Sequence, residues 1–165
     1  MNKFVIGMVA IMMVVLTAFM GCVGDGDATK VIVRASDEVI GVGGMVYVDV
    51  FIEPNKNISG AQFNIEYNPS VFSCFVVLHG DIVSMVDDFY FFDGNIDVDN
   101  GIVEGVAFCT LGENSSINSN GTMAILCFVA VSTGVCEFEL HDVVVGDMEG
   151  KELSVVTENV KIEVV

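Results

Sequence analysis

The densest group of residues that could bind a ligand is an acidic run between residues 93 and 104. Side-chain oxygens occupy positions 1, 3, 5, 7 and 12 of a twelve-residue calcium loop, at Asp93, Asn95, Asp97, Asp99 and Glu104. Such a loop needs glycine at position 6, where Val98 stands instead. The same residues alternate with apolar ones, which is typical of a β-hairpin. We therefore expect neither a metal site nor a cofactor in this chain.

Residues that could act in catalysis are few. The chain has two histidines, His79 and His141, and it lacks a GxSxG motif, an HExxH motif and a phosphate-binding glycine loop. A glycosidase would use two carboxyl groups, and nothing marks such a pair among the 23 acidic residues. The sequence therefore argues against an enzyme.

Four cysteines follow the first 22 residues, namely Cys74, Cys109, Cys127 and Cys136. An even number in an exported chain permits two disulfides in any of three pairings. All four lie in apolar, strand-like segments, so buried free thiols are at least as plausible as bridges. None has the spacing of a zinc site or the setting of a catalytic thiol.

The balance of charge excludes one class of partner. The chain carries 23 Asp and Glu residues against six Lys and Arg residues, a formal net charge of −17. Nucleic-acid binding needs clustered positive charge, which this chain does not have. The acidic surface keeps the domain in solution and could attract a basic partner.

The first 22 residues predict an export signal. Lys3 precedes an apolar run over residues 4–20, and Gly21 and Cys22 follow it. A small residue before a cysteine resembles a lipoprotein processing site, at which Cys22 becomes the lipid-attached first residue. An uncleaved membrane helix and simple secretion are the alternatives, and each places the domain outside the cytoplasm. Residues 23–29 are then a short polar linker to one domain, residues 30–165.

The domain predicts an all-β fold. β-Branched and aromatic runs are separated by Gly, Asn, Asp and Ser clusters at the intervals of a β-sandwich, with no amphipathic helix. The nine expected strands are Lys30 to Ala35, Gly44 to Glu53, Ile58 to Tyr67, Phe72 to Leu78, Phe89 to Asp99, Ile102 to Thr110, Thr122 to Val131, Val135 to Val145, and Ser154 to Val165.

Asn100-Gly101 predicts a two-residue hairpin turn, because both positions of that turn need positive φ. The expected register turns one set of facing pairs outward: Asp99 with Ile102, Asp97 with Glu104, Asn95 with Val106, and Asp93 with Phe108. The other side would enter the core: Ile96, Val98, Val103, Gly105 and Ala107. Acidic groups beside exposed Val106 and Phe108 suit a protein-binding surface, whereas an ordinary exposed sheet is the alternative.

Three loop asparagines lie in glycosylation sequons, at Asn57, Asn114 and Asn120. Each is a candidate acceptor in an exported chain.

Seven fragments, in the same order, resemble the cellulosome-type cohesin modules. The most specific is the alternating strand Ile58 to Tyr67 with the Asn68-Pro69 turn after it. The others are residues 40–50, 80–82, 100–102, 110–112, 121–124 and 138–147. Together they cover nearly the whole of the predicted domain.

This resemblance implies a jelly-roll β-sandwich that binds a dockerin-bearing protein across the sheet of its eighth, third, sixth and fifth strands. Carried over by position, it implies a partner-binding face of Gln62, Asn64, Glu66, Asn95, Asp97, Glu104, Val106, Phe108, Glu137 and Glu139. Dockerins carry paired calcium loops, so calcium is expected on the partner and not on this chain. The chain itself would be a non-catalytic receptor at the cell surface and a monomer when unbound.

Two other functions remain open at this point. A carbohydrate-binding module of jelly-roll type is one, although the chain has no Trp and its three Tyr residues form no evident strip. A cell-surface adhesion domain with a different protein partner is the other.

Overall fold

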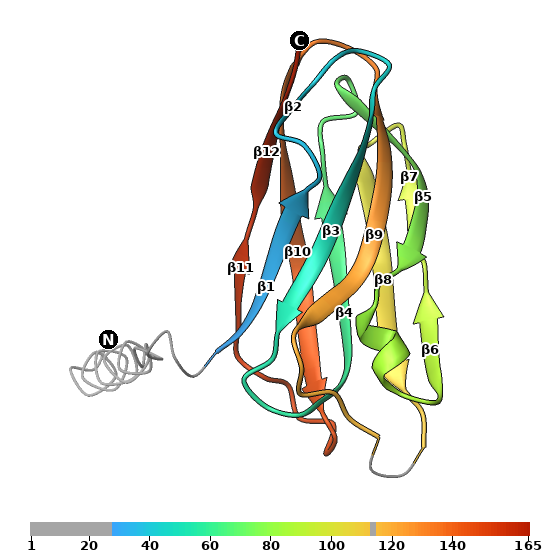
Figure 1. Cartoon of the computed structure of the whole chain (residues 1–165), viewed down its shortest axis with the longest axis vertical. Coiled ribbons are helices and arrows are strands. Elements are labelled where there is room, and N and C mark those ends of the chain that lie inside the picture. The colour runs from blue at the N-terminus through green and yellow to red at the C-terminus, as the bar shows by residue number, and fades with distance from the viewer. Residues whose placement is uncertain (1–27, 113–114) are drawn as a thin grey trace, which may run out of the picture.

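The structure is a computed structural model, and it describes residues 28–112 and 115–165 (Figure 1). The predicted export signal with Cys22, the linker as far as residue 27, and Asn114 lie outside the described residues. Within them the elements are β1 (Thr29–Ala35), β2 (Val39–Ile40), β3 (Met45–Glu53), β4 (Ile58–Glu66), β5 (Phe72–His79), the 3-10 helix η2 (Ile82–Met85), β6 (Phe89–Phe92), β7 (Asn95–Asp97), β8 (Ile102–Thr110), β9 (Gly121–Ala130), β10 (Gly134–Asp147), β11 (Val155–Glu158) and β12 (Val160–Val164).

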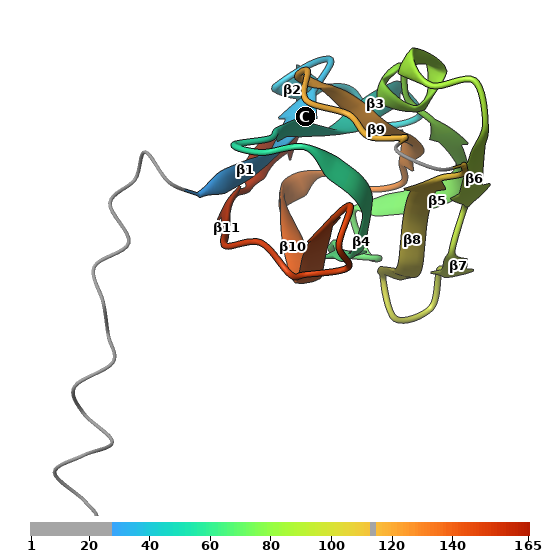
Figure 2. The ribbon, with the colours of Figure 1, turned by 90° about the horizontal axis from the view of Figure 1, so that it is seen from below.

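These strands form two sheets that pack face to face (Figure 2). One sheet has the order β11-β1-β3-β9-β5, and the other has the order β2-β12-β10-β4-β8-β6, with β7 also paired to β8. The predicted all-β sandwich is therefore confirmed, and the predicted eighth, third, sixth and fifth strands correspond to the neighbours β10, β4, β8 and β6 with β7.

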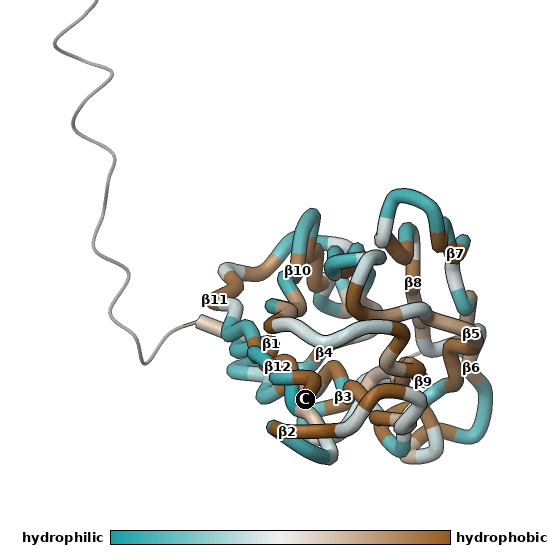
Figure 3. The backbone as a smooth tube through the Cα atoms, turned by 90° about the horizontal axis from the view of Figure 1, so that it is seen from above, coloured by the Kyte–Doolittle hydropathy of each residue, from teal (hydrophilic) through white to brown (hydrophobic). Residues whose placement is uncertain are grey.

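Alternating side chains explain why the two sheets pack together. In β3, every second residue from Val46 to Ile52 is fully buried, while Tyr47 on the other side is exposed. Where the sheets meet, the rings of Tyr67, Phe128 and Phe138 touch, with 4.9 Å between the centroids of Phe128 and each of the other two. Burial of such side chains supplies the main stabilising term of the fold. Figure 3 shows hydrophobic residues (brown) along the strands and hydrophilic ones (teal) in the loop after β7.

Two expected strands are each divided in the structure. Gly94, with φ +78°, separates β6 from β7, and a side chain there would meet the backbone oxygen of Glu104 at 2.6 Å. Asn159 separates β11 from β12, so the chain passes from the five-stranded sheet to the seven-stranded one. Its Oδ1 accepts a hydrogen bond from the Leu140 N–H at 3.1 Å, which ties the crossing point to β10.

The hairpin between β7 and β8 exists, but its turn is longer than predicted. Asp97 pairs with Ile102, so residues 98–101 form a four-residue loop in place of the two-residue turn. Gly101 adopts φ +70° and donates its N–H to the Asp97 carbonyl at 2.9 Å. The predicted facing pairs are therefore wrong: Asn95 faces Glu104, and Asp97 faces Ile102.

Candidate functional site: one face of the seven-stranded sheet

The predicted polar residues gather on the outer side of β10, β4, β8, β6 and β7, which we call the β4 face. Strand pairing places Glu139 opposite Glu66, Val144 opposite Gln62, and Asn95 opposite Glu104. The structure thus brings together eight of the ten predicted contact residues: Gln62, Asn64, Glu66, Asn95, Asp97, Glu104, Glu137 and Glu139.

The other two predicted contact residues are not on this face. Val106 is 1% exposed and Phe108 is 4% exposed, and both belong to the core. The cause is a β-bulge in β8, where Glu104 and Gly105 together oppose Asn64 between the pairs Ile65–Val103 and Phe63–Val106. The extra residue reverses the alternation from there on, so Ala107 and Cys109 face outward instead.

A second bulge lies on the other side of Asn64, in β10. The pairing of β10 with β4 shifts between His141 and Val144. Asp142 at this bulge has φ +50°, the one positive φ of a non-glycine residue among the described residues. Such a conformation costs free energy and persists only when its surroundings hold it.

Asn64 joins the two bulges. Its Oδ1 accepts a hydrogen bond from the Gly105 N–H at 2.7 Å, and its Nδ2 donates one to Asp142 Oδ2 at 2.9 Å. The amide of Asn64 therefore fixes the shape of the β4 face. Asn64 is thus a positioning residue, whereas the sequence predicted a residue that contacts the partner.

One end of the β4 face is acidic. Glu66, Glu137 and Glu139 line a hollow of about 390 Å³ where β4 ends and β10 begins. His141 Nε2 lies 3.3 Å from a Glu66 oxygen and 4.0 Å from a Glu139 oxygen, and Lys161 Nζ lies 3.1 Å from a Glu137 oxygen. Three carboxylates thus share a single lysine there.

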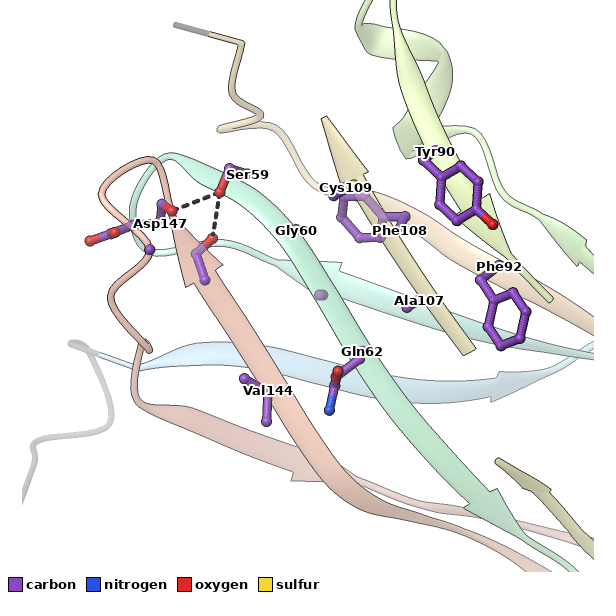
Figure 4. A pocket seen from close by; sticks show the side chains of 13 residues that line it. Ser59, Gly60, Gln62, Tyr90, Phe92, Ala107, Phe108, Cys109, Val144 and Asp147 are labelled. Atoms are coloured by element: carbon purple, nitrogen blue, oxygen red, sulfur yellow. Dashed lines mark hydrogen bonds between the residues drawn. The ribbon is translucent and has the colours of Figure 1, made fainter. Parts of the chain in front are cut away.

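The other end of the face is an apolar groove of about 350 Å³ (Figure 4). Gly60 of β4 lies opposite Gly146 of β10, and Gln62 lies opposite Ala107 of β8, so small residues leave the floor of the groove low. The exposed rings of Tyr90 and Phe92, on the edge strand β6, form one wall. Ser59 Oγ donates to the Asp147 carbonyl at 2.6 Å and holds the far end of the groove together.

Asp97 has a structural role in addition to its place on the face. Its carboxylate accepts hydrogen bonds from the Asn100 backbone N–H at 3.1 Å and from Asn100 Nδ2 at 2.8 Å. These bonds favour the charged form and lower the pKa of Asp97 below its ordinary value. Asp97 therefore stabilises the hairpin turn that precedes β8.

The four cysteines within the described residues are unpaired. Burial raises the pKa of Cys74 to about 12 and also raises the pKa values of Cys127 and Cys136. Such thiols are unreactive, because the thiolate is the nucleophilic form. Cys109 is exposed in the apolar groove. Of the two possibilities that the sequence left open, free thiols are the one observed.

The described residues contain no group of three or more His, Cys, Asp or Glu side chains placed to hold a metal ion. In that same part of the chain, no helix is long and apolar enough to cross a membrane. Asn57 and Asn120, two of the sequon asparagines, are exposed. Glycosylation at these positions stays a prediction.

Sequence reasoning missed the apolar groove. Ala107 and Val144 were not recognised as surface residues because the bulges that turn them outward leave only a weak mark in the sequence. Tyr90 and Phe92 were missed because the strand expected over Phe89 to Asp99 is broken at Gly94, which changes the side on which the residues before it lie. The mark for β8 is Gly105, since glycine inside an alternating strand often indicates a bulge. In β10 no comparable signal precedes Val144.

Comparison with known proteins identifies the family. A family model for the cohesin domain matches residues 29–164. A non-cellulosomal cohesin from Archaeoglobus fulgidus superposes with a TM-score of 0.65 at 19% identity, covering 84% of this chain and 91% of that one. A type II cohesin from Acetivibrio cellulolyticus gives 0.68 at 18% identity, covering 82% and 95%. The cohesin–dockerin complex Coh-OlpA-Doc918 from Clostridium thermocellum gives 0.65 at 20% identity, covering 84% and 100%. No curated protein matches the sequence.

The fold and the shaped outer sheet define a β-sandwich module for protein binding. The chain belongs to the cohesin domain family, whose members are non-catalytic binding modules.

Proposed function

We propose that this protein is a receptor module that binds a dockerin-bearing protein through the β4 face. The observation that carries the proposal is the combination, on one rigid sheet, of a carboxylate-rich hollow and an apolar groove. Interfaces of stable complexes use apolar anchors together with charges that match the partner. Membership of the cohesin family and the cohesin–dockerin complexes among similar structures support the choice of partner.

The mechanism is noncovalent docking, without chemistry on this chain. Ala107, Val144, Tyr90 and Phe92 replace Val106 and Phe108 as the groups that offer apolar contact. Glu66, Glu104 and Glu139 receive Lys, Arg or hydroxyl donors from the partner. Calcium is required by the dockerin, so chelation weakens binding by unfolding the partner and leaves this domain intact.

We further propose that the module acts at the cell surface. The export signal of residues 1–22 and attachment of lipid at Cys22 would place it there, and a retained N-terminal helix would do the same. Mass analysis of the exported N-terminus distinguishes a lipid anchor from a retained helix, because only the lipid anchor yields a lipid-modified Cys22.

The test of dockerin binding is a titration of the full-length chain against a panel of type I and type II dockerins, by calorimetry, with calcium and with a chelator. A dissociation constant in the nanomolar range for at least one dockerin, lost with the chelator, is the expected result. Binding to none of the panel, together with retention on insoluble cellulose, would replace the proposal with the carbohydrate-binding alternative.

A further inference from the structure

The outer surface of the five-stranded sheet is uncharged over two of its strands. β5 and β9 contain no Asp, Glu, Lys or Arg, in a chain in which 18% of the residues are charged. One side of this sheet packs against the seven-stranded sheet, so its outer side faces away from the β4 face (Figure 2). The uncharged surface is therefore separate from the proposed dockerin site.

Strand pairing arranges the outward side chains of β3, β9 and β5 in rows. In the central row, Tyr47 of β3 faces Cys127 of β9, which faces Val76 of β5. Met45 belongs to the row on one side and Leu78 to the row on the other. The exposed apolar side chains of this patch are Met45, Tyr47, Phe75 and Leu78. Contiguous exposed apolar patches usually mark sites of interaction.

The charges at the border of this patch are nearly balanced. On β1, Lys30 and Arg34 face outward. They pair with Glu53 and Asp49 of β3, respectively, and Glu158 of the short edge strand β11 adds one carboxylate. The chain as a whole has a formal charge of −17, so two copies repel each other over most of their surfaces but only weakly here. A border with both signs of charge can also match itself, as a two-fold symmetric interface requires.

The size of this outer surface suits a dimer. The nine residues of β3 give a length of roughly 30 Å, and the four strands β1, β3, β9 and β5 give a width of roughly 19 Å. Each copy therefore contributes roughly 600 Å², and the total of about 1,200 Å² is at the lower end of the range for specific interfaces. Face-to-face packing of two sheets is also the way in which the two layers of a β-sandwich meet.

We propose that two copies of this chain associate reversibly through the outer surfaces of their five-stranded sheets. The apolar patch of one copy packs on the same patch of the other, and the nearly balanced border keeps repulsion low. This proposal replaces the monomer that the sequence predicted. The two β4 faces point away from each other in such a dimer, which is then, given the proposed function, a receptor for two partner proteins.

Tyr47→Trp places a fluorescent probe in the patch, because the chain has no tryptophan of its own. Tyr90→Trp is the matched control, since Tyr90 is also an exposed strand tyrosine but lies on the β4 face. An interface of this size predicts a dissociation constant on the order of 10–100 µM. Between about 1 and 500 µM full-length chain, we expect the emission of Tyr47→Trp to move to shorter wavelength and that of Tyr90→Trp to stay constant. Sedimentation velocity should show the mass of two chains at the upper concentrations.

Leu78→Lys, combined with Tyr47→Trp, tests the patch itself. We expect the dissociation constant of the dimer to rise at least tenfold, because the interface would bury a lysine from each copy without a partner. Val39→Lys is the matched control at an exposed position of β2, in the other sheet, and should change the constant less than twofold. Raising NaCl from about 50 to 500 mM should strengthen the wild-type dimer, since salt screens the repulsion between two chains of charge −17.

Two results would overturn the proposal. A dimer that forms equally well with Leu78→Lys would show that the copies associate through another part of the chain. An emission of Tyr47→Trp that does not change with concentration would show that no second copy covers the patch. Neither result bears on dockerin binding, because Leu78 belongs to the sheet opposite the β4 face.

Discussion

The two outer surfaces of the sandwich differ in the way they carry hydrophobic residues and charge. On the five-stranded sheet, the surface over β3, β9 and β5, which we call the β9 face, exposes large apolar side chains: Met45, Tyr47, Phe75 and Leu78. One of its carboxylates is paired, since Arg34 of the adjacent β1 lies 3.8 Å from Glu53 and 3.5 Å from the centre of the Phe51 ring. The β4 face combines an apolar groove, walled by the exposed rings of Tyr90 and Phe92, with a hollow lined by three carboxylates.

This difference shows what distinguishes a binding surface in this fold. Exposed apolar side chains by themselves do not separate the two faces, because both faces carry large ones. Whole interfaces, however, are hardly more apolar than other surfaces, and their binding energy comes from a few anchors in pockets. The β4 face has hollows that such anchors can enter, and its uncompensated charge can select a partner.

The largest effect is expected from Phe108→Ala, which tests whether the side chain belongs to the core or to the β4 face. Because Phe108 is 4% exposed, we expect the free energy of unfolding to fall by about 3–5 kcal/mol. Urea denaturation followed by circular dichroism measures it. A variant of unchanged stability with lost dockerin binding would return Phe108 to the surface and invalidate the bulge at Gly105.

Introducing a lysine on each face compares the two faces directly. Glu66→Lys on the β4 face places a cation where the partner is expected to carry one, and we expect binding to weaken by about 2–3 kcal/mol, or 30- to 150-fold. Tyr47→Lys introduces the same group at an exposed position of the β9 face and should change affinity less than twofold. Calorimetric titration of one dockerin against both variants measures the difference. Equal losses, or a larger loss for Tyr47→Lys, would move the binding site to the β9 face.

Asn64→Ala sharpens the comparison by altering the shape of the β4 face while its charges stay in place. Two hydrogen bonds are lost, one at each bulge. We therefore expect the free energy of unfolding to fall by about 1–2 kcal/mol and the affinity for the dockerin to fall about tenfold. Gln62→Ala on the same strand is the control and should cost less in stability, as it removes an exposed side chain. Thermal unfolding and titration of both variants give the two quantities. If Asn64→Ala weakened binding without any loss of stability, Asn64 would be a contact residue only.

The smallest effect concerns the β9 face and depends on pH. Burial raises the pKa of Asp49 above its ordinary value of 3.8, against the opposing effect of Arg34. The folded state therefore binds this proton more tightly than the unfolded state, and stability falls as pH rises from 3.8 through the raised pKa. Asp49→Asn should remove that loss and stabilise the domain at pH 7 by less than about 0.5 kcal/mol, with no gain at pH 3.

Thermal unfolding of the wild type and the Asp49→Asn variant at both pH values checks this expectation. If the variant were more stable than the wild type by the same amount at pH 3 and at pH 7, the charge of the Asp49 carboxylate would not be the cause of the difference. Dockerin affinity should be the same for the two proteins, because Asp49 is on the face that we exclude from binding.

Local patterns predicted the strands well, and they predicted their faces less well. The bounds of β8, Ile102–Thr110, are those expected from the sequence, because alternation and the flanking turn residues act over short distances. The outward direction of Glu104 was also correct, whereas Val106, Ala107 and Phe108, which follow Gly105, were assigned to the wrong side. A strand has a period of two, so a single extra residue reverses all that follow it.

The sequence by itself determined the fold class, the strands and the acidic character of the domain, since these depend on composition and on neighbours along the chain. Only the tertiary structure decided which side chains share the β4 face and where its two hollows lie. Asn64 hydrogen-bonds Asp142, 78 positions away, and Gly105, 41 positions away. Strand pairing over such separations shifts the register at both bulges, and the sequence marks this only weakly, by Gly105 in β8.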